Sequence, residues 1–274
     1  MSGISARFIL APYESLADEY TTYVVTRRPG LPQGFSLADM AADYAAMIAE
    51  EHGGPVDVVG TSTGGSIALQ LAADHPEAVR RLVVHSAAHT LGPVGRRIQK
   101  KAAELAARGE WGAVASLMME WVMPRRGLKR RLMRPLGCAA GLAMSFGAPS
   151  DASDFIVTVE AEDAFDFRSR LGEIRAPTLV IAGAEDPGYT PELFRETAAG
   201  IPDACLILYD GMGHPASGPV FRRDLRAFLL ETGGDACADD DGRPGSDGEA
   251  FEDGRGDHRQ SEESPASAQE RTRG

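Results

Sequence analysis

The apolar residues of the first hundred positions fall into short runs separated by stretches of helical spacing. Residues 23–26 and 56–59 are rich in β-branched or aromatic side chains and predict buried strands. Between them, Ser36 is typical of a helix N-cap, and apolar residues at helical spacing continue to the glycine pair at 53–54. A helix follows the second strand directly, and residues 82–85 predict a third strand. This alternation predicts an α/β fold in which a mostly parallel sheet carries helices on both faces.

The pattern changes in the middle of the chain. Residues 93–167 have helical periodicity without a strand of comparable quality, which predicts a helical cap inserted after the third recognisable strand. Strand character returns at 178–182 and 205–209, and an amphipathic helix follows. We therefore expect a core formed by residues 1–92 and 168–231, interrupted by the cap.

Composition adds constraints on location and partners. The chain has 274 residues and a net charge of −12, which disfavours nucleic acid as a partner. Residues 232–274 hold 12 acidic and 5 basic residues with almost nothing apolar, so we expect this acidic tail to be disordered. Three widely spaced cysteines, Cys138, Cys205 and Cys237, argue against a disulfide framework or a zinc site and favour a reducing compartment. No apolar run is long enough to span a membrane, so a cytoplasmic location is expected.

The strand at 56–59 ends in a serine flanked by glycines, and a helix begins at once. Gly60 and Gly64 flank Ser62 in a Gly-x-Ser-x-Gly arrangement, and the tight turn that this predicts requires small residues at both glycine positions. A turn of this kind would hold the Ser62 hydroxyl clear of the backbone. The helix that follows would direct amide N–H groups toward developing negative charge, the first of them from Thr63. This geometry predicts a nucleophile elbow.

Two later strands end in residues that complete a catalytic set. Asp186 follows the strand at 178–182, and His214 follows the strand at 205–209. The carboxyl ends of parallel strands meet at one edge of the sheet, so both side chains are expected near Ser62. A serine needs a base to become a nucleophile, His214 is suited to that role, and Asp186 would orient the imidazole.

The stretch from about Tyr20 to Leu230 resembles the α/β-hydrolase superfamily with a helical cap. The motifs that carry this resemblance are Gly60-Thr61-Ser62-Thr63-Gly64, Ala73-Asp74-His75-Pro76-Glu77, Gly183-Ala184-Glu185-Asp186 and Gly211-Met212-Gly213-His214. The resemblance implies cofactor-independent and metal-independent hydrolysis of an ester, thioester, lactone, amide or activated C–C bond in a small acyl substrate. Three hypotheses follow: a serine esterase acting through an acyl-enzyme, a C–C bond hydrolase, and a hydrolase-fold binding protein with little turnover.

The start of the chain departs from the family pattern. The family has additional early strands, and a His-Gly or Gly-Gly loop after one of them supplies half of the oxyanion hole. No such pair stands near the start of this sequence. We expect the chain to begin downstream of that loop, so that Thr63 alone is retained as a donor. The alternative is that residues 8–12 form the strand and loop.

Several other residues could contribute to the site. His85 and His89 lie near the predicted mouth of the sheet, where ordinary structural roles are the preferred interpretation. We expect the aromatic and methionine residues of the cap to form the cap's own core, and some of them could line an acyl pocket. These residues are Trp111, Trp121, Met118, Met119 and Met123. The basic stretch at 124–131 is interpreted as a solvated face.

Overall fold

The computed structural model describes residues 10–122 and 151–230, and the structural statements below refer to them. The described residues all belong to one compact unit. The acidic tail, Met123 and the basic stretch at 124–131 lie outside the described residues.

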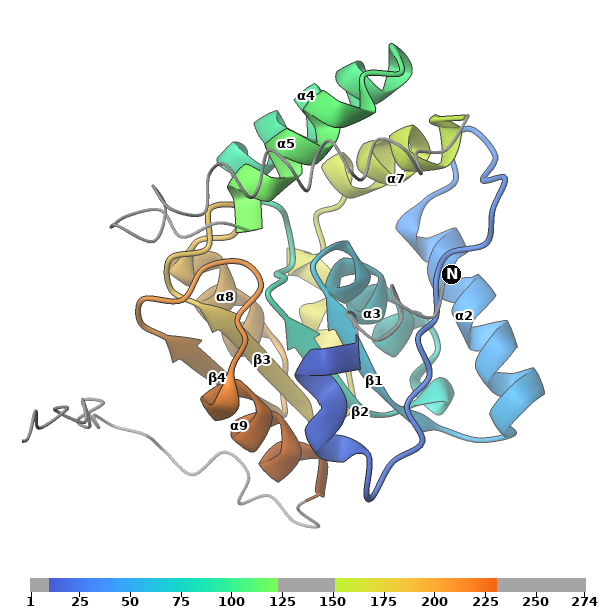
Figure 1. Ribbon diagram of the computed structural model, residues 1–274. Helices are drawn as coiled ribbons and strands as arrows, with labels where there is room; N and C mark the ends of the chain where they lie inside the picture. The colour runs from blue at the N-terminus through green and yellow to red at the C-terminus, as the bar shows by residue number, and fades with distance from the viewer. Residues whose placement is uncertain (1–9, 123–150, 231–274) are drawn as a thin grey trace, which may run out of the picture. The chain divides into compact units, whose positions relative to one another are not determined.

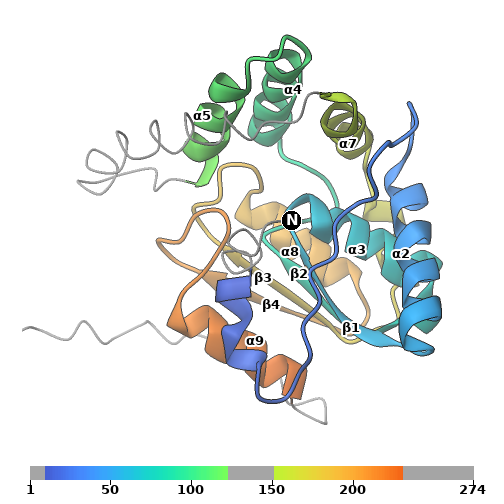
Figure 2. The ribbon, with the colours of Figure 1, turned by 45° about the vertical axis from the view of Figure 1, so that its right-hand side comes forward.

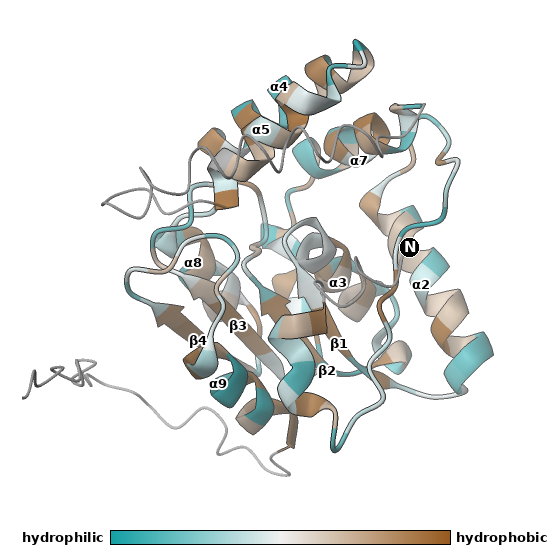
Figure 3. Ribbon diagram, in the orientation of Figure 1, coloured by the Kyte–Doolittle hydropathy of each residue, from teal (hydrophilic) through white to brown (hydrophobic). Residues whose placement is uncertain are grey.

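Four parallel strands form one sheet in the order in which they occur along the chain (Figure 1). They are β1 (Val56–Thr61), β2 (Val79–His85), β3 (Thr178–Gly183) and β4 (Ala204–Tyr209). Their register is parallel throughout, so all four carboxyl ends lie at one edge. The strands are apolar along most of their length (Figure 3), as expected for a sheet covered on both faces.

Helices cover both faces of this sheet (Figure 2), which confirms the predicted fold class. One face packs against α2 (Leu37–His52), α3 (Thr63–Asp74) and α8 (Pro191–Gly200). The other packs against α9 (Pro219–Leu230) and the short 3₁₀ helix η1 (Ala11–Leu16). Neighbouring strand residues alternate between the two cores. In β2, for example, Leu82 and Val84 belong to the first core and Val83 to the second.

The predicted helix boundaries have local causes. The Ser36 hydroxyl accepts from the Asp39 backbone N–H, and the Asp39 side chain accepts from the Ser36 backbone N–H, forming a capping box at the start of α2. The same helix ends at Gly53 in the left-handed conformation, with φ of 65°. Both α8 and α9 begin with a proline, Pro191 and Pro219, which is well suited to the first helical turn.

Between β2 and β3, the described residues 86–122 and 151–177 include a layer of three α-helices. It consists of α4 (Pro93–Ala107), α5 (Trp111–Val122) and α7 (Ser153–Asp163), and we refer to these together as the helical layer. It lies over the carboxyl ends of the strands (Figure 1). Two further 3₁₀ turns, η2 (Pro76–Ala78) and η3 (Arg168–Glu173), precede β2 and β3 respectively.

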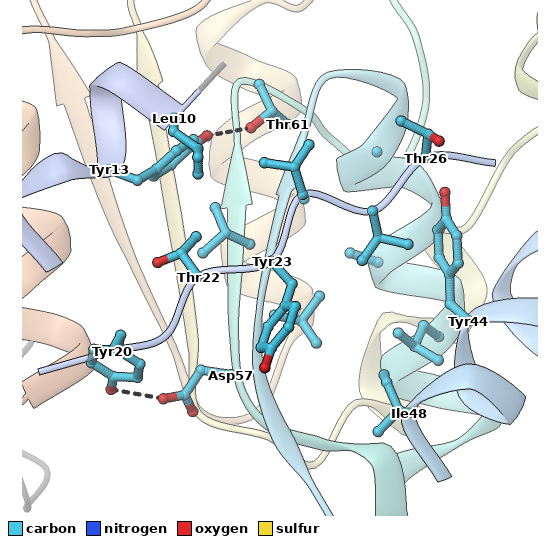
Figure 4. Close-up of a pocket in the computed structure, with 18 of the residues that line it drawn as sticks. Leu10, Tyr13, Tyr20, Thr22, Tyr23, Thr26, Tyr44, Ile48, Asp57 and Thr61 are labelled. Carbon is cyan, nitrogen blue, oxygen red and sulfur yellow. Dashed lines mark hydrogen bonds between the residues drawn. The ribbon is translucent and has the colours of Figure 1, made fainter. Parts of the chain in front are cut away.

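The strand predicted at residues 23–26 is absent from the structure. This segment is irregular, and Tyr23 and Val25 are 61% and 43% exposed. A strand requires a paired neighbour, but a groove of about 440 Å³ separates this segment from β1 (Figure 4). Among the described residues β1 pairs with β2 alone, and the helical insertion therefore follows the second described strand and not the third.

Hydrogen bonds from two tyrosines that precede this irregular segment connect the chain to both ends of β1. The Tyr20 hydroxyl donates to Asp57 Oδ2 at 2.8 Å, and it also lies 2.7 Å from the Leu229 carbonyl oxygen. At the upper end, the Tyr13 and Thr61 hydroxyls lie 2.7 Å apart (Figure 4). The part of the chain that leads into the segment is thus joined to β1 by side chains and not by a β ladder.

The cysteines differ from what their spacing led us to expect. Cys205 in β4 is disulfide-bonded, so the spacing and odd number of the cysteines, which argued against a disulfide framework, did not exclude a single disulfide at this residue. An odd number of cysteines excludes complete pairing, but it does not exclude one pair.

In the described ranges, no helix has both the length and the apolar character needed to cross a membrane.

Candidate active site

Ser62 stands between the end of β1 and the first residue of α3 in a strained backbone conformation. Its φ of 55° and ψ of −129° lie outside the regions that L-residues favour. The surrounding backbone holds it there, because its N–H donates to the His85 carbonyl at 3.0 Å and its carbonyl accepts from the Gly65 N–H at 2.7 Å. The predicted sharp turn is therefore present at the predicted residue.

The glycines around Ser62 differ in how closely they are packed. A Cβ on Gly60 would lie 2.4 Å from the Gly64 carbonyl oxygen, and one on Gly65 would lie 2.3 Å from the Ala87 Cβ. A Cβ on Gly64 would meet no atom within 4 Å. The close approach of β1 and α3 thus requires glycine at position 60, and the packing of α3 against the loop after β2 requires glycine at position 65. The expectation that position 64 must lack bulk is wrong, because Gly64 borders the open groove.

The structure brings Ser62, His214 and Asp186 together at the carboxyl edge of the sheet. His214 Nε2 lies 3.1 Å from Ser62 Oγ, and His214 Nδ1 lies 2.6 Å from Asp186 Oδ2. The His214 side chain is 8% exposed and that of Asp186 is fully buried. A buried carboxylate on Nδ1 fixes the proton there, which leaves Nε2 free to accept the serine proton.

The second oxygen of Asp186 is bound by its own loop. Asp186 Oδ1 accepts from the backbone N–H groups of Gly188 at 2.8 Å and Tyr189 at 3.1 Å. The Tyr189 ring then stacks against His214, with 6.1 Å between the ring centroids. The loop after β3 therefore fixes both the carboxylate and one face of the imidazole.

Thr63, the predicted oxyanion donor, is the first residue of α3. Its backbone N–H has no acceptor within the helix, because the first turn of a helix lacks preceding carbonyls. Its hydroxyl donates to Glu162 Oε2 at 2.5 Å. Sequence reasoning missed Glu162, since the acidic residues of α7 carry no local sign that one of them is buried.

His85 and His89 are buried, and each lies within hydrogen-bonding distance of neighbouring groups of the fold. His85 is buried, and its Nε2 lies 2.8 Å from the Ala216 carbonyl, while Tyr13 and Thr61 hydroxyls contact its Nδ1. Burial lowers the pKa of His85 to about 4, so the ring is neutral near pH 7. His89 contacts the Thr197 hydroxyl, and burial likewise lowers its pKa.

The aromatic residues of α5 have different positions. Trp121 is buried, with its ring centroid 5.5 Å from that of His214. A Cβ on Gly188 would lie 2.0 Å from Trp121, so the indole packs directly on the loop after β3. Trp111 instead packs edge-on against Phe155 of α7, within the core of the helical layer, where Met118 also packs. Sequence reasoning left open which of these residues borders the site, and of those that the structure describes Trp121 packs against His214.

A hollow of about 190 Å³ lies beside His214, lined in part by Val122, Met212 and Ser217. Across residues 10–122 and 151–230 there is no grouping of three or more His, Cys, Asp or Glu side chains suited to a metal ion.

Comparison with known proteins identifies the family. The model of the alpha/beta hydrolase family matches residues 5–228, and the chain therefore belongs to that family. Relatives include proteins named putative carbamate hydrolase RutD. The one from Yersinia enterocolitica is 30% identical over 224 residues, which cover 80% of this chain and 79% of that protein. The one from Klebsiella pneumoniae is 29% identical over 184 residues, covering 67% and 68% respectively.

Solved structures share the fold. The alpha/beta hydrolase MGS-M2 from a Medee basin deep-sea metagenome library superposes with a TM-score of 0.67 at 19% identity, covering 85% of this chain and 86% of that one. The enol-lactonase from Burkholderia xenovorans superposes with a TM-score of 0.58 at 23% identity, covering 75% and 78%. By the family to which it belongs, the chain is an enzyme of the α/β-hydrolase type.

Proposed function

We propose that the protein is a serine hydrolase that cleaves a small or medium carboxylic ester, or a related acyl compound, through an acyl-enzyme. The observation that carries this proposal is the continuous contact from Ser62 Oγ through His214 to Asp186, at 3.1 Å and 2.6 Å. Relatives named for carbamate hydrolysis and a structural neighbour named for lactone hydrolysis support a substrate with an acyl carbon.

The proposed reaction uses each residue in turn. His214 Nε2 takes the proton of Ser62 Oγ as the oxygen attacks the acyl carbon, and Asp186 stabilises the imidazolium that forms. The Thr63 N–H, at the positive end of α3, donates to the oxyanion of the tetrahedral intermediate. His214 then protonates the leaving group. Water, activated by the same imidazole, hydrolyses the acyl-Ser62 ester and restores the free hydroxyl.

The test is hydrolysis of p-nitrophenyl butyrate by Ser62→Ala, His214→Ala and the double variant. Each single change is expected to lower kcat by about 10⁴-fold or more, and the double variant should lose little beyond either one, since triad losses are not additive. Ser116→Ala is the matched control, because within residues 10–122 and 151–230 that hydroxyl donates to the Gly112 carbonyl of its own helix, at 2.8 Å. Undiminished turnover by folded Ser62→Ala contradicts the proposal. A folded wild-type protein without turnover would favour a binding function.

A further inference from the structure

In the described part of the chain, two residues other than glycine have a positive φ, and both are serines at the ends of neighbouring strands. One is Ser62, which the proposed reaction uses. The other is Ser86, directly after β2, with a φ of 50° and no exposed surface. Its N–H donates to the Ile181 carbonyl of β3 at 2.9 Å. Strained backbone of this kind persists where surrounding contacts impose it, and it is frequent at active sites. The triad alone gives Ser86 no role.

The contacts of Ser86 lead to the loop that carries His214. Ala216 lies two residues after His214 and is fully buried. Its backbone N–H donates to Ser86 Oγ at 3.1 Å, and its carbonyl oxygen lies 2.8 Å from His85 Nε2. Two consecutive side chains at the end of β2 therefore bind both backbone groups of a single residue in this loop. We refer to His85 and Ser86 together as the brace.

The loop at residues 213–217 depends on these contacts. It belongs to no helix or strand, and within residues 10–122 and 151–230 no backbone–backbone hydrogen bond joins it to the rest of the fold. Its backbone is instead held at Ala216 by the brace. Removing either side chain would leave a buried backbone group of Ala216 without its partner, which is unfavourable. The loop would then shift to regain a partner, and His214 would move with it.

The proton positions in the brace follow from its partners. A carbonyl oxygen only accepts, so His85 carries its proton on Nε2 and donates to Ala216. Nδ1 is then an acceptor, and the hydroxyl oxygens of Thr61 and Tyr13 lie 3.1 and 3.2 Å from it. Burial lowers the pKa of His85 to about 4, so this neutral form persists near pH 7. Both ring nitrogens are therefore engaged by the fold, which leaves neither of them to bind a substrate.

The brace also connects the loop of the base to the nucleophile. The His85 carbonyl accepts from the Ser62 N–H at 3.0 Å, while the His85 ring contacts the loop of His214. Phe221 of α9 stacks on that ring, with 4.4 Å between the ring centroids. His85 is thus fixed from three sides and is bonded to the elbow at one end and to the base loop at the other.

We propose that His85 and Ser86 are positioning residues that hold the loop of His214 at the distance from Ser62 that proton transfer requires. The inference rests on the proposed function and adds two residues that act through His214 without touching the substrate. Proton transfer from Ser62 Oγ to His214 Nε2 depends steeply on their separation, and a displacement of about 1 Å can cost roughly 100-fold in rate. Because His214 acts in both acylation and deacylation, loss of the brace should lower kcat and leave KM nearly unchanged.

Two substitutions at Ser86 separate positioning from stability. Ser86→Gly and Ser86→Ala both remove the acceptor of the Ala216 N–H, but only glycine adopts a positive φ without strain. Ser86→Gly should therefore resist urea at least as well as Ser86→Ala. Both should nevertheless hydrolyse p-nitrophenyl butyrate with a kcat lowered about tenfold or more, from the lost hydrogen bond and the displaced base. A kcat that recovers with stability in Ser86→Gly, or that is unchanged in both variants, overturns the inference.

At His85, a conservative variant should restore the rate. His85→Gln can present its NH₂ group to the Ala216 carbonyl, whereas His85→Leu leaves that oxygen without a donor. We expect kcat to fall about tenfold in His85→Leu and to be largely restored in His85→Gln. His89→Leu is the matched control, since His89 is also buried but contacts the Thr197 hydroxyl, at 3.0 Å, and it should keep the wild-type kcat. Equal kcat values for the two variants of His85, or an equal fall in His89→Leu, overturn the role of the ring.

A double variant shows whether the brace acts through His214. In a His214→Ala background, Ser86→Gly should not slow fluorophosphonate labelling of Ser62 any further, because the base that it positions is already absent. A further loss means that Ser86 acts elsewhere and overturns the inference.

The wild-type protein distinguishes this inference from the function on which it rests. A folded wild-type protein with neither turnover nor labelling overturns both. Wild-type turnover together with an unchanged kcat in the brace variants overturns the brace and leaves the hydrolase intact. Where His85→Leu does not fold, the comparison of Ser86→Gly with Ser86→Ala decides.

Discussion

The two glycines that flank Ser62 should respond differently to the same substitution. In Gly60→Ala, the new Cβ would lie 2.4 Å from the Gly64 carbonyl oxygen and 2.6 Å from the Ala68 Cβ. Neither neighbour can be moved by a side-chain rotation, so β1 and α3 must separate. Overpacking of this kind lowers the free energy of unfolding by about 1–3 kcal/mol. The displaced turn would also increase the distance between Ser62 Oγ and His214 Nε2.

Gly64→Ala is the matched control in the same turn. Its Cβ would meet nothing within 4 Å, and its φ is not in the left-handed region. Alanine in place of glycine within α3 should leave unfolding free energy unchanged or raise it by up to about 0.5–1 kcal/mol.

Urea denaturation and p-nitrophenyl butyrate hydrolysis measure both effects. Gly60→Ala should lower the denaturation midpoint and kcat/KM together, while Gly64→Ala should keep a midpoint at or above that of the wild type. The reasoning is refuted if Gly60→Ala is tolerated as well as Gly64→Ala, or if Gly64→Ala is the more destabilising of the two.

Three other perturbations have defined outcomes. Burial lowers the pKa of His85 from 6.5 to about 4, so the unfolded chain binds more protons between these values. Stability should be complete above about pH 6.5 and fall by roughly 3 kcal/mol as the pH approaches 4. Urea titrations of His85→Gln should show a smaller acid loss, and an equal loss would contradict this. Tyr20→Phe removes the hydroxyl contacts to Asp57 and Leu229, at 2.8 and 2.7 Å. It should lower the free energy of unfolding by about 1–2 kcal/mol in the same assay. No change would mean that these two contacts do not hold the chain beside β1. Truncation after Glu231, which also removes Cys237, should change melting temperature and esterase activity little when both proteins are compared in reducing buffer, and a clear fall in either would show that the tail contributes.

Much of the fold was predictable because its signals are local. The valines of β1, the capping pair Ser36 and Asp39, and the prolines that open α8 and α9 each act on their own few residues. The positions of Asp186 and His214 also followed, because parallel strands place their carboxyl ends at one edge.

What the sequence did not reveal depends on contacts between distant segments. Residues 23–26 have the composition of a strand, but pairing requires a neighbour at the right distance, which composition does not specify. Glu162 resembles any acidic residue of a surface helix until Thr63, Gln99 and Tyr189 surround it. Gly64 fits the motif as well as Gly60 does, and only the packing of α3 against β1 distinguishes them. The location in the cytoplasm and the disorder of the tail stay predictions.

The central claim is that Ser62 is a nucleophile activated by His214. Intact wild-type protein treated with a fluorophosphonate probe and digested for mass spectrometry tests this most directly. The account predicts one stoichiometric adduct, on the peptide that contains Ser62, with a labelling rate that falls by orders of magnitude in His214→Ala. A folded wild-type protein that stays unlabelled, or an adduct on another serine that forms equally fast in His214→Ala, would contradict it.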